Sequence, residues 1–311
     1  MKKRIFWIFL VLAVMAGGFF GYSKMRKTEK AAEKPVVVRP ADPYTVEKNI
    51  MYCTPDGKPQ KLDVFTPANI KDNTPLVIHV HGGSWVSGKK SDYDMIDSIE
   101  SLATAGFVVA SIDYRLAPTD KFPAQIQDVK CAIKYMRVNA AKYHVDPNKI
   151  GLLGESAGAH LASLAATTAG KADFEPLENA GINESVLAVV DLFGPIDLQK
   201  YVDTTPVVQS GVEQFVGDYN KTLASPINYV TAQTPPFLII HGDQDNLVPF
   251  DQSQVLYDKL VSVGVNAKLV KVKNGWHGLL PSGGGEISPS IDELKKETIN
   301  FYIEKLGKPV K

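Results

Sequence analysis

The chain has 311 residues, 44% of them hydrophobic and 22% charged, which is the composition of a globular protein with a sizeable core. Its formal net charge is zero, but residues 1–34 hold 8 Lys and Arg against 2 Asp and Glu, so the remainder carries a net charge of −6. An acidic body of this kind argues against a general nucleic-acid-binding surface, and no nucleic-acid partner is expected.

The N-terminus carries an uncharged, mostly apolar run from Ile5 to Tyr22, preceded by Lys-Lys-Arg. Eighteen residues of helix span roughly 27 Å, close to the thickness of a bilayer core. Two interpretations remain open for residues 1–22: an uncleaved membrane anchor, and a secretory signal peptide with a cleavage site near residues 14–16. We favour the anchor because the basic residues at 24–27 disfavour cleavage. Either one predicts that the body lies outside the cytoplasm, attached to the cell membrane or secreted.

Residues 23–44 are charged, rich in Ala and then Pro-bearing, which predicts a flexible linker. A catalytic domain is expected over residues 45–311. It begins with two strands, 45–52 and 61–66, joined by a Pro-Asp-Gly turn and therefore forming a hairpin.

Strands and helices alternate through the rest of the domain, which predicts an α/β fold with a mostly parallel central sheet and helices on both faces. The segment 193–234 interrupts this alternation with several prolines and aromatics, and we expect it to form a small partial cap over one wall of a pocket. The predicted strands are 76–80, 107–112, 150–153, 186–192, 237–241 and 267–272, and the predicted helices are one ending at Ala105 and those at 124–143, 157–169, 253–263 and 291–306.

Two cysteines are present, Cys53 at a strand end and Cys131 on the apolar face of a predicted helix. They could form a disulfide in an oxidising compartment. We favour two buried free thiols, because both positions are expected to be apolar and the spacing matches no metal site.

The stretch from Ile150 to Ala159 reads IGLLGESAGA and passes directly from an apolar strand into a helix. Such a sharp turn forces its central residue, Ser156, into a strained backbone conformation. Glycines two positions before and two after Ser156 remove side chains that would clash. This is the G-x-S-x-G nucleophile elbow.

Other reactive residues also follow predicted strands, where ligands bind in sheets of this class. Residues 81–85 (HGGSW) contain adjacent glycines whose backbone N–H groups can approach a ligand closely. Residues 242–249 supply two aspartates, and residues 273–278 supply His277. A serine, an acid and a histidine thus occur in that order, each on its own loop after a strand.

Five motifs, HGGSW, DYRL (113–116), GESAG, HGDQDNLVP and GWHG, resemble an α/β-hydrolase of the esterase/lipase group. The resemblance covers about residues 45–306. It is closest to the bacterial feruloyl/acetylxylan esterase-like domain, with the hormone-sensitive-lipase group next. It implies the α/β-hydrolase fold, with Ser156 as nucleophile, His277 as base and Asp245 as acid. Asp245 is preferred to Asp243 because the family's acid precedes an x-x-Val-Pro element.

The resemblance also assigns oxyanion-hole donors to the backbone N–H groups of Gly83, Ser84 and Ala157. Ser84 departs from the third glycine of many relatives, which a backbone donor tolerates. Three aromatic residues close to these positions are candidates for lining the substrate pocket: Trp85, Phe193 and Trp276. For the two tryptophans, simple packing against neighbouring side chains is an equally open interpretation. His160 is expected to be a packed, hydrogen-bonded core residue, and Asp113 and Arg115 are expected to order a loop.

These residues predict a serine carboxylesterase that hydrolyses small or carbohydrate-linked esters through an acyl-enzyme on Ser156. Neither a metal nor an organic cofactor is expected. An amide or formamide hydrolase using the same triad is the alternative enzyme, and a binding protein that has kept the fold is the alternative outside catalysis. The oligomeric state is left open.

Overall fold

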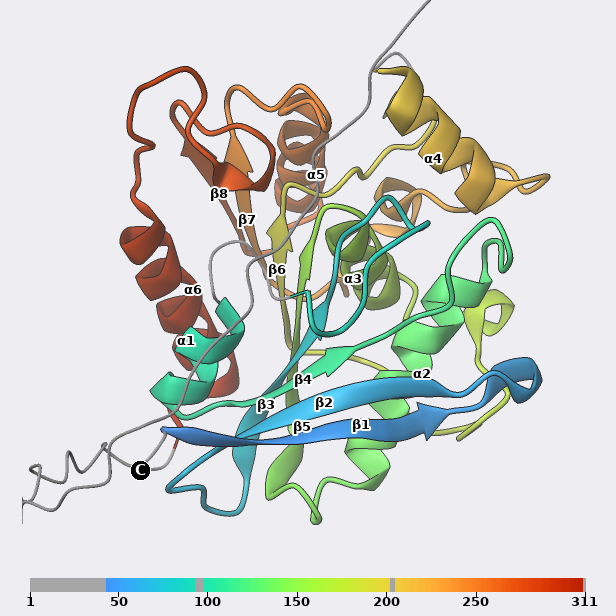
Figure 1. The fold of residues 1–311 in the computed structure, drawn as a ribbon, viewed down its shortest axis with the longest axis vertical. Coiled ribbons are helices and arrows are strands. Elements are labelled where there is room, and N and C mark those ends of the chain that lie inside the picture. The colour runs from blue at the N-terminus through green and yellow to red at the C-terminus, as the bar shows by residue number, and fades with distance from the viewer. Residues whose placement is uncertain (1–42, 93–97, 202–204, 310–311) are drawn as a thin grey trace, which may run out of the picture. The chain divides into compact units, whose positions relative to one another are not determined.

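The structure is a computed structural model that describes residues 43–92, 98–201 and 205–309 (Figure 1). The predicted anchor or signal peptide (1–22) and nearly all of the predicted linker lie outside these residues. Among the helices of the described segments, none combines the length and the apolar character needed to cross a bilayer.

An eight-stranded sheet forms the centre of the domain, in the order β1-β2-β4-β3-β5-β6-β7-β8. The first two strands form the predicted antiparallel hairpin, and β2 is also antiparallel to β4, whereas all later neighbours are parallel. The strands are β1 (Tyr44–Cys53), β2 (Gln60–Pro67), β3 (Thr74–Val80), β4 (Val108–Ile112), β5 (Val145–Glu155), β6 (Ala188–Leu192), β7 (Phe237–Gly242) and β8 (Ala267–Val272).

Helices cover both faces of this sheet, as predicted (Figure 1). One face packs against α2 (Ala124–Val138), α3 (Ala157–Thr167) and α5 (Asp251–Ser262), and the other against α1 (Ser98–Ala105) and α6 (Ile291–Leu306). Successive strand residues enter opposite cores: Ile78 lies in the first core, and its neighbour Val77 lies in the second. Burial on both faces explains why these strands are largely apolar.

The strand register brings the carboxyl ends of the parallel strands to one edge. Val80 of β3 pairs with Gly154 of β5, and Glu155 pairs with Leu192 of β6. The loops that follow these strands, and those after β7 and β8, therefore meet above the same edge of the sheet.

Two element boundaries differ from the sequence prediction by more than two residues. The helix starting at 124 ends at Val138 rather than at 143, although Ala140 beyond it is buried in the same core. Ala140 is therefore a buried apolar residue beyond the end of the helix, and the prediction extended the helix too far. The strand expected at 150–153 runs from Val145 to Glu155, because Val145 pairs with Thr74 across a register shift.

Cys53 and Cys131 form a disulfide, so the prediction of two free thiols is wrong. Both residues are buried, as expected, with a Cα–Cα distance of 6.3 Å. The same apolar packing that buries the end of β1 against α2 places the two sulfurs within bonding reach. Burial of the two cysteines therefore does not exclude a disulfide between them, because the same packing produces both.

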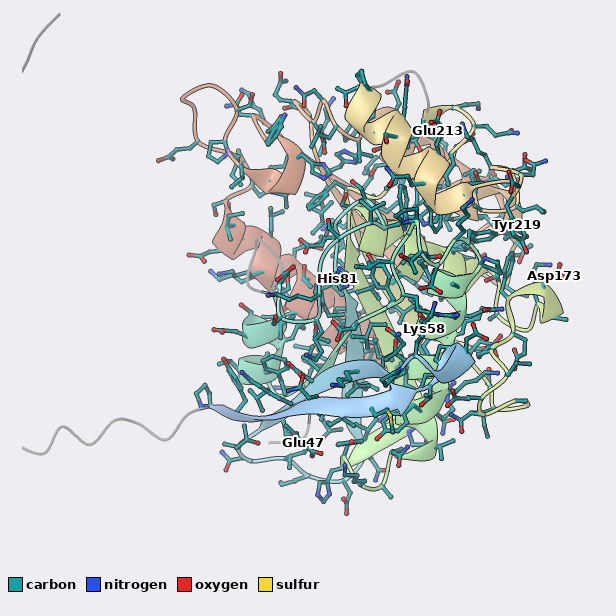
Figure 2. All side chains as sticks on the ribbon, turned by 45° about the vertical axis from the view of Figure 1, so that its right-hand side comes forward. Glu47, Lys58, His81, Asp173, Glu213 and Tyr219 are labelled. Carbon is teal, nitrogen blue, oxygen red and sulfur yellow. A yellow bond between two sulfur atoms is a disulfide. The ribbon has the colours of Figure 1, made fainter. Side chains whose placement is uncertain are left out.

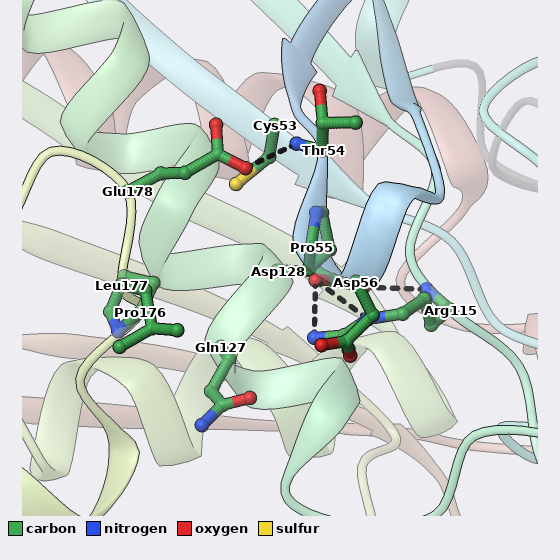
Figure 3. Close-up of a pocket in the computed structure, with 10 residues that line it drawn as sticks. All are labelled: Cys53, Thr54, Pro55, Asp56, Arg115, Gln127, Asp128, Pro176, Leu177 and Glu178. Carbon is green, nitrogen blue, oxygen red and sulfur yellow. Dashed lines mark hydrogen bonds and ion pairs between the residues drawn. The ribbon is translucent and has the colours of Figure 1, made fainter.

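A cavity of about 240 Å³ lies beside this disulfide, between the hairpin turn and α2 (Figure 3). Three of its charged residues, Arg115, Asp128 and Asp56, interact with one another, and Glu178 accepts from the backbone N–H of Thr54. Arg115 donates to the Asp128 carboxylate at 2.9–3.0 Å, to Asp56 at 3.1 Å and to the carbonyl oxygen of Ala124 at 3.0 Å. Arg115 therefore orders this part of the chain, as predicted, and Asp113 does the same by accepting from the backbone N–H of Lys90 at 2.7 Å.

Candidate active site

Ser156 occupies the turn between β5 and α3 with φ 52° and ψ −120°, a conformation that costs a non-glycine residue roughly 1–3 kcal/mol. Two neighbouring glycines make the turn possible. A Cβ at Gly154 would lie 2.3 Å from the carbonyl oxygen of Gly158, and one at Gly158 would lie 2.0 Å from that of Val80. The backbone of Ser156 is also fixed by its N–H, which donates to Leu192 on β6 at 2.9 Å.

The loop after β3 has left-handed backbone at three consecutive residues: Gly83 (φ 111°), Ser84 (φ 53°) and Trp85 (φ 62°). Gly83 cannot carry a side chain, since a Cβ there would lie 2.2 Å from the carbonyl oxygen of Ser87. The carbonyl oxygen of Gly83 accepts from the backbone N–H groups of Val86 and Ser87 at 3.1 and 3.0 Å. These bonds close a tight turn beside Ser156.

The residues assigned as nucleophile, base and acid lie together in a hydrogen-bonded row. His277 Nε2 is 3.1 Å from Ser156 Oγ, and His277 Nδ1 is 2.7 Å from Asp245 Oδ2. A carboxylate only accepts, so Nδ1 carries the proton when His277 is neutral and Nε2 is free to accept from the serine. Each side chain lies within the reach that general-base activation requires.

The second oxygen of Asp245 is also engaged. Oδ1 accepts from the backbone N–H groups of Leu247 and Val248, both at 2.9 Å, and the side chain is fully buried. Asp243 is oriented elsewhere and accepts from the backbone N–H of Asn274 at 2.9 Å. The geometry therefore pairs His277 with Asp245 and leaves Asp243 to shape the turn.

His241, at the end of β7, is a site residue to which the sequence analysis gave no role. Its Nε2 lies 2.8 Å from the carbonyl oxygen of Val248 and 3.2 Å from Asp245 Oδ2. A carbonyl cannot donate, so Nε2 carries a proton and directs it towards both oxygens, while Nδ1 pairs with Ser253 Oγ at 2.6 Å. The available signal was its position at a strand end, four residues before the acid.

The charge state of Asp245 follows from these contacts. Burial raises its pKa, but the hydrogen bonds from His241 and His277 outweigh burial and hold the pKa well below its usual range. Asp245 is therefore ionised at neutral pH and can stabilise a protonated His277.

A cleft of about 540 Å³ opens onto Ser156 and His277. Its lining includes Phe193, whose ring packs edge-on against His277 with centroids 4.9 Å apart. The other lining residues come from the loop after β3, the elbow and the loop after β7: Gly82, Gly83, Ser84, Ser87, Gly88, Asp92, Glu155 and Leu247.

The two tryptophans that were candidates for lining this cleft are not among its lining residues. Trp85 is buried, with its indole stacked on Phe215. Trp276 donates from its indole nitrogen to Asn246 Oδ1 at 2.6 Å and so ties together the loops that carry Asp245 and His277. Of the three aromatic candidates, only Phe193 belongs to the cleft.

The segment between β6 and β7 contains α4 (Pro206–Val216), the helical part of the predicted cap (Figure 1). Val212 and Phe215 face the core, whereas Glu213, and Tyr219 beyond the helix, lie on its outer side (Figure 2). Between α4 and the loop after β3 lies a cavity of about 530 Å³, which shares three lining residues with the cleft: Gly83, Ser84 and Ser87.

The arrangement can activate a hydroxyl and bind an oxyanion. Ala157 is the first residue of α3, and the N–H groups of the first helical turn have no partner within the helix. Ala157 adjoins Ser156, and Gly83 and Ser84 line the same cleft. Backbone donors from two separate segments are therefore available next to the serine.

Comparison with known proteins places these features in a family. The family model BD-FAE matches residues 62–260, a span that includes Gly83, Ser84, Ser156, Ala157 and Asp245. Esterase LipC of Mycobacterium tuberculosis (strain ATCC 25618 / H37Rv) is 35% identical over 263 residues, which cover 81% of this chain and 64% of that protein. The chain spans between half and two thirds of the length of the first curated relatives it matches.

Solved structures agree with this placement. A truncated form of a carbohydrate esterase from gut microbiota has a TM-score of 0.72 at 32% identity, covering 86% of this chain and 98% of that one. Thermogutta terrifontis esterase 2, phosphonylated by sarin, has a TM-score of 0.73 at 27% identity, covering 88% and 99% of the two chains.

Proposed function

The chain belongs to the BD-FAE family, and from this membership we propose that it is a serine carboxylesterase with Ser156 as nucleophile, His277 as general base and Asp245 as the acid that orients the base. The observation that carries the proposal is the continuous row from Ser156 Oγ to His277 Nε2, at 3.1 Å, and from His277 Nδ1 to Asp245 Oδ2, at 2.7 Å. A serine hydroxyl is a weak nucleophile unless a base at this distance accepts its proton.

In the first half of the reaction, Ser156 Oγ attacks the ester carbonyl carbon while His277 Nε2 takes the hydroxyl proton. The resulting imidazolium is stabilised by the ionised Asp245. The N–H groups of Gly83, Ser84 and Ala157 bind the oxyanion, and each such donor contributes roughly 3 kcal/mol to the transition state. The tetrahedral intermediate collapses, and the alcohol leaves with the proton from His277.

In the second half, water attacks the acyl-enzyme. His277 accepts a proton from the water, and hydroxide adds to the acyl carbonyl in the same oxyanion hole. Collapse releases the carboxylic acid and returns the proton to Ser156. Both halves use the same three side chains and the same backbone donors.

We propose small or carbohydrate-linked esters as the substrate class. Support comes from the cleft of about 540 Å³ and from the likeness to a carbohydrate esterase at 32% identity.

The full chain should hydrolyse p-nitrophenyl acetate and butyrate, with kcat/KM falling for longer acyl groups, and should deacetylate acetylated xylan. If the protein is instead an amide or formamide hydrolase using the same triad, it should turn over an aryl formamide faster than p-nitrophenyl acetate. If the protein binds esters but neither hydrolyses them nor is labelled by a fluorophosphonate, both the esterase and the amide-hydrolase hypotheses are contradicted.

We also propose that the catalytic domain works outside the cytoplasm, attached through residues 1–22 or secreted. The disulfide between Cys53 and Cys131 supports this, because such bonds persist mainly in oxidising compartments. Protein taken from its native cells and denatured in the presence of a thiol alkylator should be alkylated at neither cysteine until a reductant is added. Alkylation of both without reduction would contradict the proposal.

A further inference from the structure

Trp85 is held by contacts that lie outside its own loop. Its indole Nε1 donates to His160 Nδ1 at 3.1 Å, and its ring stacks on Phe215 with centroids 4.5 Å apart and planes 10° apart. Its carbonyl oxygen accepts from the backbone N–H of Ala117 at 2.9 Å. Since Ser84 and Trp85 both have left-handed backbone, contacts of this kind are needed to hold the loop in shape.

His160 belongs to the helix that begins at the elbow. It lies four residues after Ser156, and its backbone N–H donates to the Ser156 carbonyl oxygen at 3.0 Å. Its side chain is completely buried, and Nε2 lies 2.7 Å from the carbonyl oxygen of Ala224 in the cap segment. The ring therefore joins the loop after β3, the elbow helix and the segment between β6 and β7.

The protonation state of this ring is fixed by its two partners. The indole of Trp85 only donates, and the carbonyl of Ala224 only accepts, so His160 is neutral with its proton on Nε2. Burial lowers the pKa of His160 to about 4, which keeps the ring neutral in this role at ordinary pH.

We propose that His160 and Trp85 are positioning residues that fix the two halves of the oxyanion hole relative to each other. One half, the N–H groups of Gly83 and Ser84, is on the loop that also carries Trp85. The other half, the N–H of Ala157, is on the helix that carries His160. The Trp85–His160 hydrogen bond is a direct side-chain link between these segments. This inference rests on the proposed function, because it assigns those N–H groups to the oxyanion.

The link acts on the transition state more than on substrate binding. A donor displaced by about 1 Å can cost on the order of 10²-fold in rate, because the oxyanion forms only as the carbonyl carbon is attacked. Weakening the link should therefore lower kcat and leave KM nearly unchanged.

The test compares His160→Leu with His160→Asn in the full chain. Leucine removes both ring hydrogen bonds, whereas asparagine Oδ1 is attached at the same position along the side chain as His Nδ1 and can accept from Trp85. With p-nitrophenyl acetate, His160→Leu should lower kcat by about 10- to 100-fold with KM within about 2-fold, and His160→Asn should recover most of the loss. Leu164→Ala, also fully buried on α3, is the matched control for helix destabilisation and should leave kcat near the wild-type value.

Trp85→Phe provides a second variant, since it keeps an aromatic ring that can stack on Phe215 and removes the indole N–H together with the pyrrole part of the indole. It should lower kcat as His160→Leu does, and the double variant Trp85→Phe/His160→Leu should be no slower than His160→Leu alone.

Equal kcat for His160→Leu and Leu164→Ala, or failure of asparagine to recover activity, would overturn the inference. The indole ¹H–¹⁵N resonance of Trp85 gives a readout without catalysis: it should shift in His160→Leu and return towards its position in His160→Asn. If the wild type shows no esterase activity, the proposed function fails while this resonance still tests the link.

Discussion

Replacing Ser156 by alanine should lower kcat for p-nitrophenyl acetate by about 10⁶-fold, because no other group in the row can form the acyl-enzyme. The fold should be retained, since alanine removes only the hydroxyl and the backbone N–H still donates to Leu192. The measurement is steady-state turnover, with active sites counted by fluorophosphonate labelling.

Ser262→Ala serves as the control, because this exposed serine at the end of α5 only caps its own helix through a hydrogen bond to the Lys259 carbonyl oxygen. It should match the wild type in both turnover and labelling. Turnover by Ser156→Ala within about tenfold of the wild type would show that hydrolysis does not pass through an acyl-enzyme on this residue.

Asp245→Asn should lower kcat by about 10⁴-fold, and the local geometry explains why. Oδ1 accepts from the backbone N–H groups of Leu247 and Val248, so the amide oxygen of asparagine would stay there. The amide NH₂ would then face His277 Nδ1 and favour the tautomer with the proton on Nε2. That proton would point at Ser156 and prevent the ring from accepting the hydroxyl proton.

Asp243→Asn is the matched control two residues away, since an asparagine oxygen can still accept from the backbone N–H of Asn274. It should change kcat by less than about 3-fold, as expected for a residue outside the hydrogen-bonded row. A loss in Asp243→Asn as large as that in Asp245→Asn would show that the acid has been misassigned.

The parts of the site that could be predicted from sequence are those whose geometry is local. Gly154 and Gly158 bracket Ser156 within five consecutive residues, and a Cβ at Gly154 would meet the backbone of Gly158 inside the elbow itself. The sheet was predictable for a related reason. Strands buried on both faces, such as β3, are largely apolar, and each is followed by a helix.

The parts that could not be predicted depend on packing between distant segments. Cys53 and Cys131 are 78 residues apart, and no spacing rule sets the distance between a hairpin end and α2. Likewise, nothing in the sequence of β7 itself distinguishes His241 from an ordinary strand residue. Its role depends on the loop after β7, which folds back and places Asp245 beside its ring. The inward orientation of Trp85 could not be decided from sequence, because proximity along the chain to Gly83 and Ser84 does not determine which way a side chain points.

The segment between β6 and β7 contributes to the wall of the site but supplies none of the three residues of the hydrogen-bonded row. Residues 194–236 bring α4 and much of the wall beyond Ser84, yet Ser156, Asp245 and His277 all lie outside them. Substrate range can therefore diverge by replacing this segment while the reaction is conserved. Any replacement must still present a carbonyl oxygen to His160 Nε2, where Ala224 now does, and a ring to Trp85, where Phe215 now stacks.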